Sequence, residues 1–240
     1  MDISRIREHY VNAGLSRDDL ADDPITQFKR WFEEWVATNP YDANAVIVAT
    51  TDSEGWPSAR AVLLKKLDER GFVFYTNRQS AKGIDLEESG RAALCFLWHS
   101  VERQVRVVGQ VEHLLDNESD EYFSSRPRGA QIAAWASPQS QVINNRAELE
   151  HRNAAAETHF QADTRISRPP HWGGYLVRPH IVEFWQGRRN RLHDRLRYRK
   201  AKPPDNTPSH TGLPQHIIAT SPTTRADTAC ADWIVERLAP

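Results

Sequence analysis

A series of short strand-like segments between residues 45 and 113 limits the folds open to this chain more than any other feature. The segments are rich in β-branched and aromatic residues, and the turns between the first three are short. Short turns favour an antiparallel meander, because a parallel crossover needs about a dozen linking residues or more. Such strands predict a closed or nearly closed barrel, which removes exposed sheet edges. The predicted strands are residues 45–51, 58–67, 72–77, 92–98 and 104–113.

Helices and further strands are predicted on both sides of this region. Residues 24–37 repeat apolar and aromatic side chains at helical spacing, and Asp23-Pro24 supplies an N-cap followed by a first-turn proline. We expect the aromatic face of this helix to be buried. Further helices are predicted at residues 81–88, 119–125, 130–136 and 145–160, and further strands at residues 174–177, 181–185, 191–199 and 233–238. The expected fold class is mostly β with flanking helices (α+β), in one domain spanning residues 1–240.

Two segments are expected to be flexible. Residues 1–20 form an N-terminal segment, and residues 201–231 are rich in proline, threonine and serine. The composition of the second segment cannot bury enough apolar surface to offset its ordering entropy. We therefore expect residues 201–231 to form a mobile surface insertion.

The composition argues against several classes of protein. Lys plus Arg (31) and Asp plus Glu (32) nearly cancel, so neither nucleic acid nor a membrane surface is an expected partner. No apolar run approaches the roughly 20 residues that span a bilayer. Cys95 and Cys230 cannot form a cysteine-based zinc site, the histidines lack ligand spacing, and no metal is expected. The expected location is the cytoplasm.

The first candidate cluster surrounds the predicted strand at residues 72–77. Arg60 and Lys65 flank the strand before it, and Ser80-Ala81-Lys82 begins the helix after it. Backbone N–H groups at a helix start, with a lysine beside them, suit a phosphate, although ordinary surface charge is the simpler interpretation. Arg60 and Lys65 face opposite sides of a regular strand. They reach one ligand only through a bulge or by contacting different parts of it.

Two weaker clusters follow. Tyr122 and Arg126 are four residues apart, so a helix presents both on one face. A guanidinium beside a phenol hydroxyl suits a phosphate, and a surface arginine at a helix end is an equally compatible interpretation. Gln139 and Ser140 are polar loop residues that carry no signal by themselves.

The fourth cluster is the most informative. Arg191, His193 and Arg195 alternate along a predicted strand, which places all three on one face. Cationic side chains aligned in this way repel one another, so they favour an anionic ligand. Trp185 lies just upstream, where its indole can pack on a flat ring. The alternative is an edge strand that charge protects from aggregation.

Taken in order, these motifs resemble the pyridoxine/pyridoxamine 5′-phosphate oxidase family. The resemblance spans the chain through IREHYVNAGL, RAVLLK, FYTN, WHSVERQV, YFSSRPR, QIAAWASPQS, HWGGYLV, VEFWQG, NRLHDR and ERLAP. It implies an antiparallel FMN-binding split β-barrel that works as a homodimer with two FMN sites at the subunit interface. It also implies FMN-dependent oxidation of pyridoxamine or pyridoxine 5′-phosphate to pyridoxal 5′-phosphate. Dioxygen is the implied electron acceptor, with hydrogen peroxide released, and ammonia from the amine.

The resemblance also implies a role for each matching residue. Arg7 and Tyr10 are implied to cover the substrate, while Arg191 and His193 line its reactive side and are the expected catalytic residues. The implied ligands of the substrate phosphate are Lys65, Tyr122 and Arg126. The implied FMN contacts are Arg60, Lys65, Tyr75, Thr76, Lys82, Gln104, Gln139, Ser140, Trp185 and Arg195.

Three departures from the family pattern leave two other functions open. Ala81 and Ala130 stand where the family often carries an arginine and a serine, and residues 201–231 replace a short turn. Each lost hydrogen bond weakens anion binding by about tenfold to a hundredfold, with Arg78 and Arg128 as candidates to compensate. The alternatives are a split-barrel flavin reductase with another substrate and a non-catalytic carrier of FMN or pyridoxal phosphate.

Overall fold

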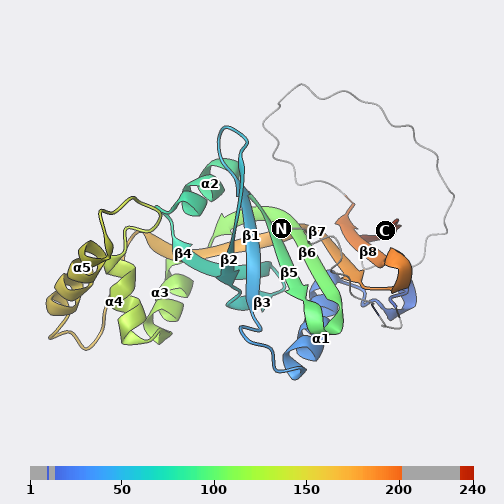
Figure 1. Cartoon of the computed structure of the whole chain (residues 1–240), viewed down its shortest axis with the longest axis horizontal. Coiled ribbons are helices and arrows are strands. Elements are labelled where there is room, and N and C mark those ends of the chain that lie inside the picture. The colour runs from blue at the N-terminus through green and yellow to red at the C-terminus, as the bar shows by residue number, and fades with distance from the viewer. Residues whose placement is uncertain (1–9, 11–13, 202–232) are drawn as a thin grey trace, which may run out of the picture.

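The structure of the chain is a computed structural model that describes residue 10, residues 14–201 and residues 233–240. Within these residues, the strands form one antiparallel sheet that curls on itself, with helices at its ends (Figure 1). The strands are β1 Ala45–Thr51, β2 Pro57–Leu63, β3 Lys66–Asp68, β4 Gly71–Asn77, β5 Arg91–Trp98, β6 Arg103–His113, β7 Trp172–Gln186, β8 Asp194–Lys200 and β9 Trp233–Leu238. The helices are α1 Pro24–Ala37, α2 Ala81–Ser89, α3 Asp116–Ser125, α4 Arg128–Ala136 and α5 Arg146–His159, with short 3-10 turns η1 Arg17–Asp19, η2 His99–Val101 and η3 Arg189–Arg191.

The strand order explains why the sheet curls. Strands follow the order β2-β1-β5-β6-β7-β4-β3, with β8 paired to β7 and β9 paired to β8. β2 and β3 lie at opposite ends of that order, yet only Leu64 and Lys65 join them. The backbone N–H of Lys65 donates to the Val73 carbonyl oxygen of β4 at 2.8 Å. The two ends of the sheet must therefore meet, and Lys65 lies at the junction.

Helix α1 closes one end of the barrel interior with aromatic side chains. Phe28 is fully buried, with its ring centroid 5.0 Å from that of Phe72 and 4.8 Å from that of Phe96. Trp31 packs edge-on against Phe184 of β7 at 5.2 Å. The Asp23 side chain caps the helix by accepting the N–H groups of residues 25 and 26. The predicted buried aromatic face of this helix is confirmed.

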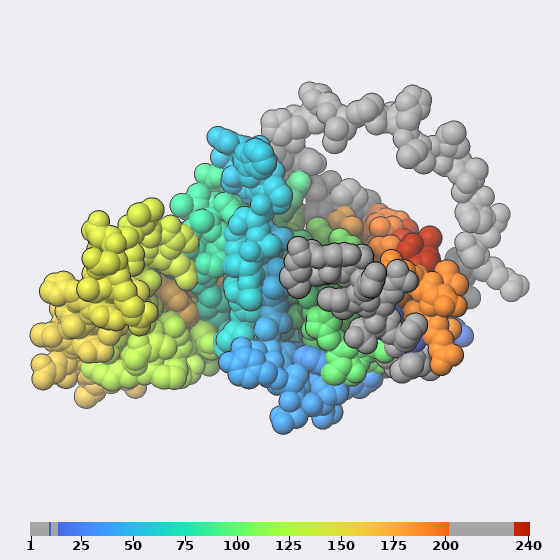
Figure 2. Space-filling model, viewed as in Figure 1, coloured from blue at the N-terminus to red at the C-terminus, as the bar shows by residue number. Residues whose placement is uncertain are grey.

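Helices α3, α4 and α5 form a separate lobe at one end of the sheet (Figure 2). Phe123, Ile132, Phe160 and Trp172 form the apolar contact that holds this lobe to the start of β7. α5 itself has no buried residue. The lobe therefore positions α3 and α4 beside β4 and β7, while most of α5 remains exposed.

Three predicted strand boundaries are wrong. Residues 58–67 are not one strand, because the chain breaks at the junction between β2 and β3. Residues 174–177 and 181–185 belong to one long strand, β7, in which a register shift between Val108 and Gly109 of β6 accommodates Pro179. The predicted strand at 191–199 begins only at Asp194.

The fold class itself is confirmed. The chain is mostly β, its strands pair antiparallel, and helices flank the sheet. The predicted mobile insertion at residues 201–231 falls outside the described residues except for residue 201. The predicted flexibility of residues 1–20 likewise falls largely on residues 1–9 and 11–13, which are not described.

We predict that Phe28→Ala lowers the free energy of unfolding by about 3–5 kcal/mol, because a large cavity opens between α1 and the sheet. Urea unfolding followed by circular dichroism measures the loss. Val36→Ala is the matched control on the same helix, since Val36 is 44% exposed and its change is expected to stay within about 0.5 kcal/mol. Equal losses in the two variants would contradict this account of the core.

Candidate functional site

A cavity of about 380 Å³ lies where β2 and β4 meet α2, α3 and α4. We call it the polar pocket, and its volume is within the range of small-molecule sites. Barrel closure brings β2, Lys65 and β4 to one side of it, and the helical lobe supplies the other. The pocket brings together the sequence-predicted residues Lys65, Tyr75, Thr76, Lys82, Tyr122, Arg126 and Gln139.

Lys82 is a buried ammonium group without an acidic partner among the described residues. It is 8% exposed, and its Nζ donates to Ser80 Oγ and Gln139 Oε1, both at 3.1 Å. Burial, with a smaller contribution from the charge of Arg60, lowers the pKa of Lys82 to about 8. Gln139 Oε1 also accepts from Thr76 Oγ1 at 3.1 Å. A buried cation held by neutral groups is a position that an anionic ligand would stabilise.

Arg60 lies beside Lys82, although it does not line the polar pocket. Its guanidinium donates to Thr50 Oγ1 and Ser58 Oγ, each at 2.6 Å. Asp85 of α2 is 3.9 Å away. The N-terminus of α2 faces the same region and adds partial positive charge. Together these groups place positive charge and N–H donors beside Lys82, so the cluster is more than the ordinary surface charge that the sequence favoured.

Three stacked rings form the apolar side of the polar pocket. The ring centroid of Tyr75 is 4.1 Å from that of Tyr122 and 5.3 Å from that of Trp172. The Arg126 guanidinium lies over the Trp172 ring at 4.7 Å. Trp172 belongs to the HWGGYLV motif but was not predicted as a site residue. A tryptophan directly before two glycines at the start of a strand is the signal that could have identified it.

Arg126 is the second cationic residue of the polar pocket that lacks an acidic partner among the described residues. Its Nη1 atom is buried and has no hydrogen-bond partner among the described residues. Burial lowers the pKa of this guanidinium. A buried donor without a partner is costly, so this atom also fits an anion that binds in the pocket. Arg126 follows the end of α3 in an extended conformation, so the predicted helical pairing with Tyr122 is wrong although both residues line the pocket.

Other predicted residues gather far from the polar pocket, in a group that we call the distal cluster (Tyr10, Gln104, Trp185, His193 and Arg195). The ring centroids of Trp185 and His193 are 4.6 Å apart, and Tyr10 packs edge-on against both. In the sheet register, Gln104 and Arg195 are both paired with Trp185, on β6 and β8 respectively. Directly paired residues share a face, so these three side chains form one row.

His193 is held as a neutral ring at the edge of the distal cluster. Its Nδ1 accepts the backbone N–H of Arg188 at 3.1 Å. Burial and the charge of Arg191 lower the pKa of His193, which favours the neutral imidazole at neutral pH. With Nδ1 accepting, the neutral ring carries its proton on Nε2, which remains available as a donor to a ligand.

Arg191 does not align with His193 and Arg195, so the predicted common face is wrong. Arg191 lies in η3 before β8 begins, and it is exposed. Asn190 and Arg191 have φ values of 57° and 61°, in the left-handed region, which turns the backbone away from strand geometry. Arg191, His193 and Arg195 do alternate in the sequence. That alternation cannot show that Asn190 and Arg191, which are not glycines, form a turn.

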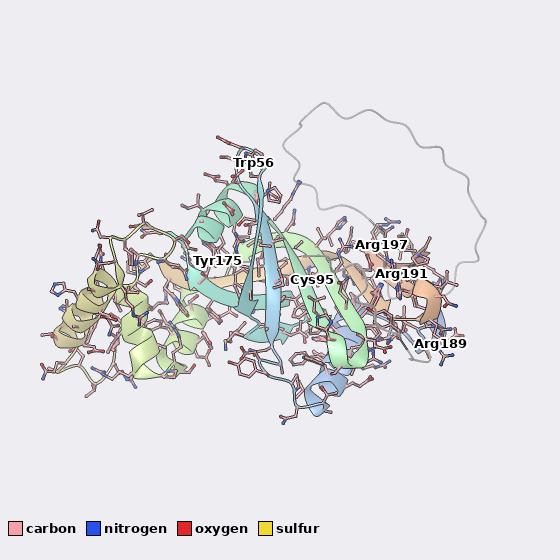
Figure 3. The ribbon with its side chains drawn as sticks, viewed as in Figure 1. Trp56, Cys95, Tyr175, Arg189, Arg191 and Arg197 are labelled. Atoms are coloured by element: carbon pink, nitrogen blue, oxygen red, sulfur yellow. The ribbon has the colours of Figure 1, made fainter. Side chains whose placement is uncertain are left out.

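The predicted site residues therefore form two groups within one chain. Trp172 of the polar pocket and Trp185 of the distal cluster lie near opposite ends of β7, about 43 Å apart along an extended strand. Figure 3 shows Arg191 on the side of the molecule away from the helical lobe. Ser140 follows Gln139 with φ 71° and is exposed outside the polar pocket. Arg7 lies outside the described residues.

The arginines proposed to compensate for Ala81 and Ala130 do not line the polar pocket. Arg128 donates to the carbonyl oxygens of Phe160 and Asp163 at 2.6 and 3.0 Å, which ties α4 to the end of α5. The Arg78 guanidinium lies close against Gly173, where a side chain would collide with it. The pocket thus depends on Lys82 and Arg126 for buried positive charge.

Two other kinds of feature are absent from the described part of the chain. No helix there is long and apolar enough to cross a membrane. Among the same residues, no group of three or more His, Cys, Asp or Glu side chains is arranged to hold a metal ion.

We predict that Lys82→Met stabilises the ligand-free protein by about 1 kcal/mol at pH 7. Burial of the charged ammonium costs about 3 kcal/mol, as the lowered pKa indicates, and the variant no longer has this cost. The variant also loses two hydrogen bonds of about 1 kcal/mol each, which is the smaller effect. The unfolded state binds more protons between about pH 8 and about pH 10.5, so this lysine makes wild-type stability rise across that range, and the variant lacks the rise. Urea unfolding measures both effects.

Lys66→Met is the control, because the Lys66 ammonium makes only half-exposed ion pairs with Asp68 and Glu118. Its stability is expected to change by less than about 0.5 kcal/mol. A large destabilisation by Lys82→Met would instead make Lys82 a structural support of α2 and would contradict its assignment as an anion site.

Comparison with known proteins connects this geometry to a family. Residues 32–160 match the family model described as pyridoxamine 5′-phosphate oxidase. Residues 172–240 match the model described as the pyridoxine 5′-phosphate oxidase C-terminal dimerisation region. Among solved structures, PhzG from Burkholderia lata, in complex with tetrahydrophenazine-1-carboxylic acid, superposes with a TM-score of 0.75 at 28% identity, covering 93% of this chain and 95% of that chain.

A second solved structure supports the fold alone. It is a pyridoxamine 5′-phosphate oxidase-related, FMN-binding protein from Nostoc punctiforme, with a TM-score of 0.61, 14% identity and coverage of 92% of this chain and 100% of that chain. The split-barrel fold predicted from the sequence is thereby confirmed.

Two curated relatives share the name pyridoxine/pyridoxamine 5′-phosphate oxidase. The protein from Salinibacter ruber is 49% identical over 238 residues, which cover 99% of both chains. The protein from Rubrobacter xylanophilus is 52% identical over 202 residues, which cover 84% of this chain and 93% of the relative. With both halves matched and identity near one half over almost the whole chain, this protein belongs to the pyridoxine/pyridoxamine 5′-phosphate oxidase family of oxidoreductases.

Proposed function

We propose that this protein binds FMN and oxidises pyridoxamine or pyridoxine 5′-phosphate to pyridoxal 5′-phosphate. Dioxygen would accept the electrons and leave as hydrogen peroxide, with ammonia released from the amine substrate. One observation supports the proposal beyond family membership. The polar pocket holds the buried Lys82 ammonium and the partly buried Arg126 guanidinium, and neither has an acidic partner among the described residues. The reaction needs two phosphates to be bound side by side, one of the cofactor and one of the substrate.

The two cationic groups divide between the two phosphates. Lys82, with Arg60 and the start of α2, forms the more buried position and suits the FMN phosphate. Arg126 lies across the aromatic stack beside Tyr122, and with Lys65 it suits the substrate phosphate. The rings of the stack offer flat apolar surfaces between these positions. The donor set therefore fits the cofactor that the family resemblance implies.

A second copy of the chain would complete each site. The distal cluster lies too far along β7 to reach a ligand in the polar pocket of its own chain. The outer face of the barrel exposes apolar side chains suited to a subunit contact, with Leu63 and Leu97 37% and 45% exposed. The matched dimerisation region includes Trp185, His193 and Arg195 of the distal cluster. We therefore propose a homodimer in which Trp185, His193 and Arg195 of one chain face the polar pocket of the other.

Bound FMN would supply the redox chemistry, as the acceptor for a hydride from the C4′ carbon of the substrate with dioxygen as the final electron acceptor. The residues of the chain hold the reacting atoms together and neutralise the phosphates. His193 presents Nε2–H as a donor that orients the substrate ring, and the neutral state of its imidazole suits that task. Arg191, exposed on η3 in the single chain, would contact the substrate across the interface.

A non-catalytic carrier of FMN and pyridoxal phosphate is the second candidate. Ala81 and Ala130 favour it, because each removes a polar group that the family often uses to hold a phosphate and neither Arg78 nor Arg128 replaces it in the polar pocket. The flavin reductase is less well supported, since Tyr122 and Arg126 form a phosphate site that another substrate would not need.

Anaerobic addition of pyridoxamine 5′-phosphate to FMN-loaded protein tests the oxidase against the carrier. We expect the absorbance of oxidised flavin to bleach, to recover when air is admitted, and to yield the aldehyde product. Arg191→Ala should keep its FMN and bleach at least about a hundredfold more slowly. Flavin that stays oxidised in the wild-type protein, with substrate binding demonstrated, would reject the oxidase and support the carrier.

We also predict that FMN binds more weakly above pH 8. The phosphate favours the protonated form of Lys82, whose pKa is about 8 in the ligand-free protein. Above that pH the protein must take up a proton to bind, so the dissociation constant rises by up to about tenfold per pH unit. Quenching of flavin fluorescence between about pH 7 and about pH 9 measures the effect. Lys82→Met should bind FMN weakly and without this dependence, and the same slope in both proteins would remove Lys82 from the site.

A further inference from the structure

Glu183 is a buried carboxylate near the C-terminal end of β7. It is 6% exposed and lies between Val182 and Phe184, both fully buried in the barrel core. Strand alternation directs Glu183 to the opposite face from these two neighbours, the face that carries Trp185. A buried carboxylate is costly unless cationic partners compensate it. The partners of Glu183 therefore indicate what it does.

The nearer partner of Glu183 is Arg195 of the distal cluster. Arg195 Nε donates to Glu183 Oε1 at 2.8 Å, whereas Arg106 Nη1 reaches Oε2 at 3.5 Å. The side chain of Arg195 is 28% exposed and that of Arg106 is 50% exposed. The contact with Arg195 is thus shorter and better shielded from water, so it is the stronger of the two.

On β8, Glu183 contacts Arg195 and not Arg197, the residue paired with it. Glu183 is paired directly with Arg106 on β6 and with Arg197 on β8. Glu236 of β9 already holds Arg197, accepting from its Nε at 2.9 Å and its Nη2 at 2.5 Å. Glu183 therefore reaches diagonally to Arg195, a distance that long side chains span across neighbouring strands.

This contact fixes the orientation of the Arg195 guanidinium. Nε is held by Glu183, and Nη1 donates to the carbonyl oxygen of Ala239 at 3.0 Å. Among the described residues, Nη2 has no hydrogen-bond partner. Two fixed nitrogens define the plane of the guanidinium and direct the third at a ligand. Because the row places Arg195 beside Trp185, that ligand would be the one that Trp185 contacts.

We propose that Glu183 is a positioning residue that orients Arg195 for FMN. The inference rests on the proposed function, in which Arg195 of one chain contacts the cofactor held by the other. Glu183 itself need not touch the flavin. By holding Nε, it removes rotamer freedom that Arg195 would otherwise lose on binding.

A double-mutant cycle on FMN affinity tests the proposal. The dissociation constant is measured by quenching of flavin fluorescence for the wild-type protein, Glu183→Gln, Arg195→Ala and the double variant. We expect Glu183→Gln to weaken FMN binding by about tenfold in the wild-type background and to add nothing in the Arg195→Ala background. Glu183→Asp, which keeps the charge on a shorter side chain, should recover part of the affinity.

Arg106→Gln is the matched control, because it removes the other partner of Glu183 without touching Arg195. FMN affinity in this variant should stay within about twofold of wild type. Melting of the ligand-free proteins shows whether each variant is folded at the assay temperature.

The measurements distinguish failure of the positioning role of Glu183 from failure of the proposed function. Additive losses in the cycle, or an effect of Glu183→Gln as small as that of Arg106→Gln, would overturn the positioning role while the proposed function stands. Unchanged FMN affinity in Arg195→Ala would overturn both the inference and the assignment of Arg195. A wild-type protein that does not bind FMN would reject the proposed function itself.

Discussion

Closure of the barrel through Leu64 and Lys65 is the constraint on which the candidate site depends. These two residues join strands at opposite ends of the sheet order, so the ends must meet. Their meeting brings β2 and Lys65 beside Tyr75 and Thr76 of β4, and the helical lobe then encloses the polar pocket. The long strand β7 supplies the second constraint, because it carries Trp172 at one end and Trp185 near the other. Barrel closure therefore forms the polar pocket, and the length of β7 separates the distal cluster from it within one chain.

Electrostatics supports the proposal that the polar pocket binds an anionic ligand. Lys82 is buried beside Arg60, and Arg126 has a buried donor without a partner among the described residues. Both arrangements reduce the stability of the ligand-free protein, and an anion would compensate both. By contrast, Arg195 of the distal cluster is already compensated by the neighbouring Glu183. We therefore infer that the polar pocket provides binding energy and that the distal cluster provides orientation.

Much of this organisation could be predicted from the sequence, for physical reasons. The aromatic periodicity that buries Phe28, and the β-rich segments with their short turns, are local signals that the tertiary structure retains. The motif resemblance identified seven of the fifteen residues that line the polar pocket, including its three charged side chains, Lys65, Lys82 and Arg126. Turns made by non-glycine residues were missed, as the left-handed conformation of Arg191 shows. β7 was predicted as two strands, at residues 174–177 and 181–185, because the register shift that keeps it continuous depends on β6, which is distant in the sequence.

The central claim is that each site takes its two halves from two chains, and complementation between inactive subunits tests it most directly. Arg126→Ala disables the polar pocket, and Arg191→Ala disables the half supplied by the other chain. Each variant alone should be inactive. Co-expressed at equal levels, they should recover about a quarter of wild-type activity, since about half of the dimers are mixed and each mixed dimer has one intact site. Mixed dimers that form but show no activity would place both halves of the site in a single chain and would contradict the account.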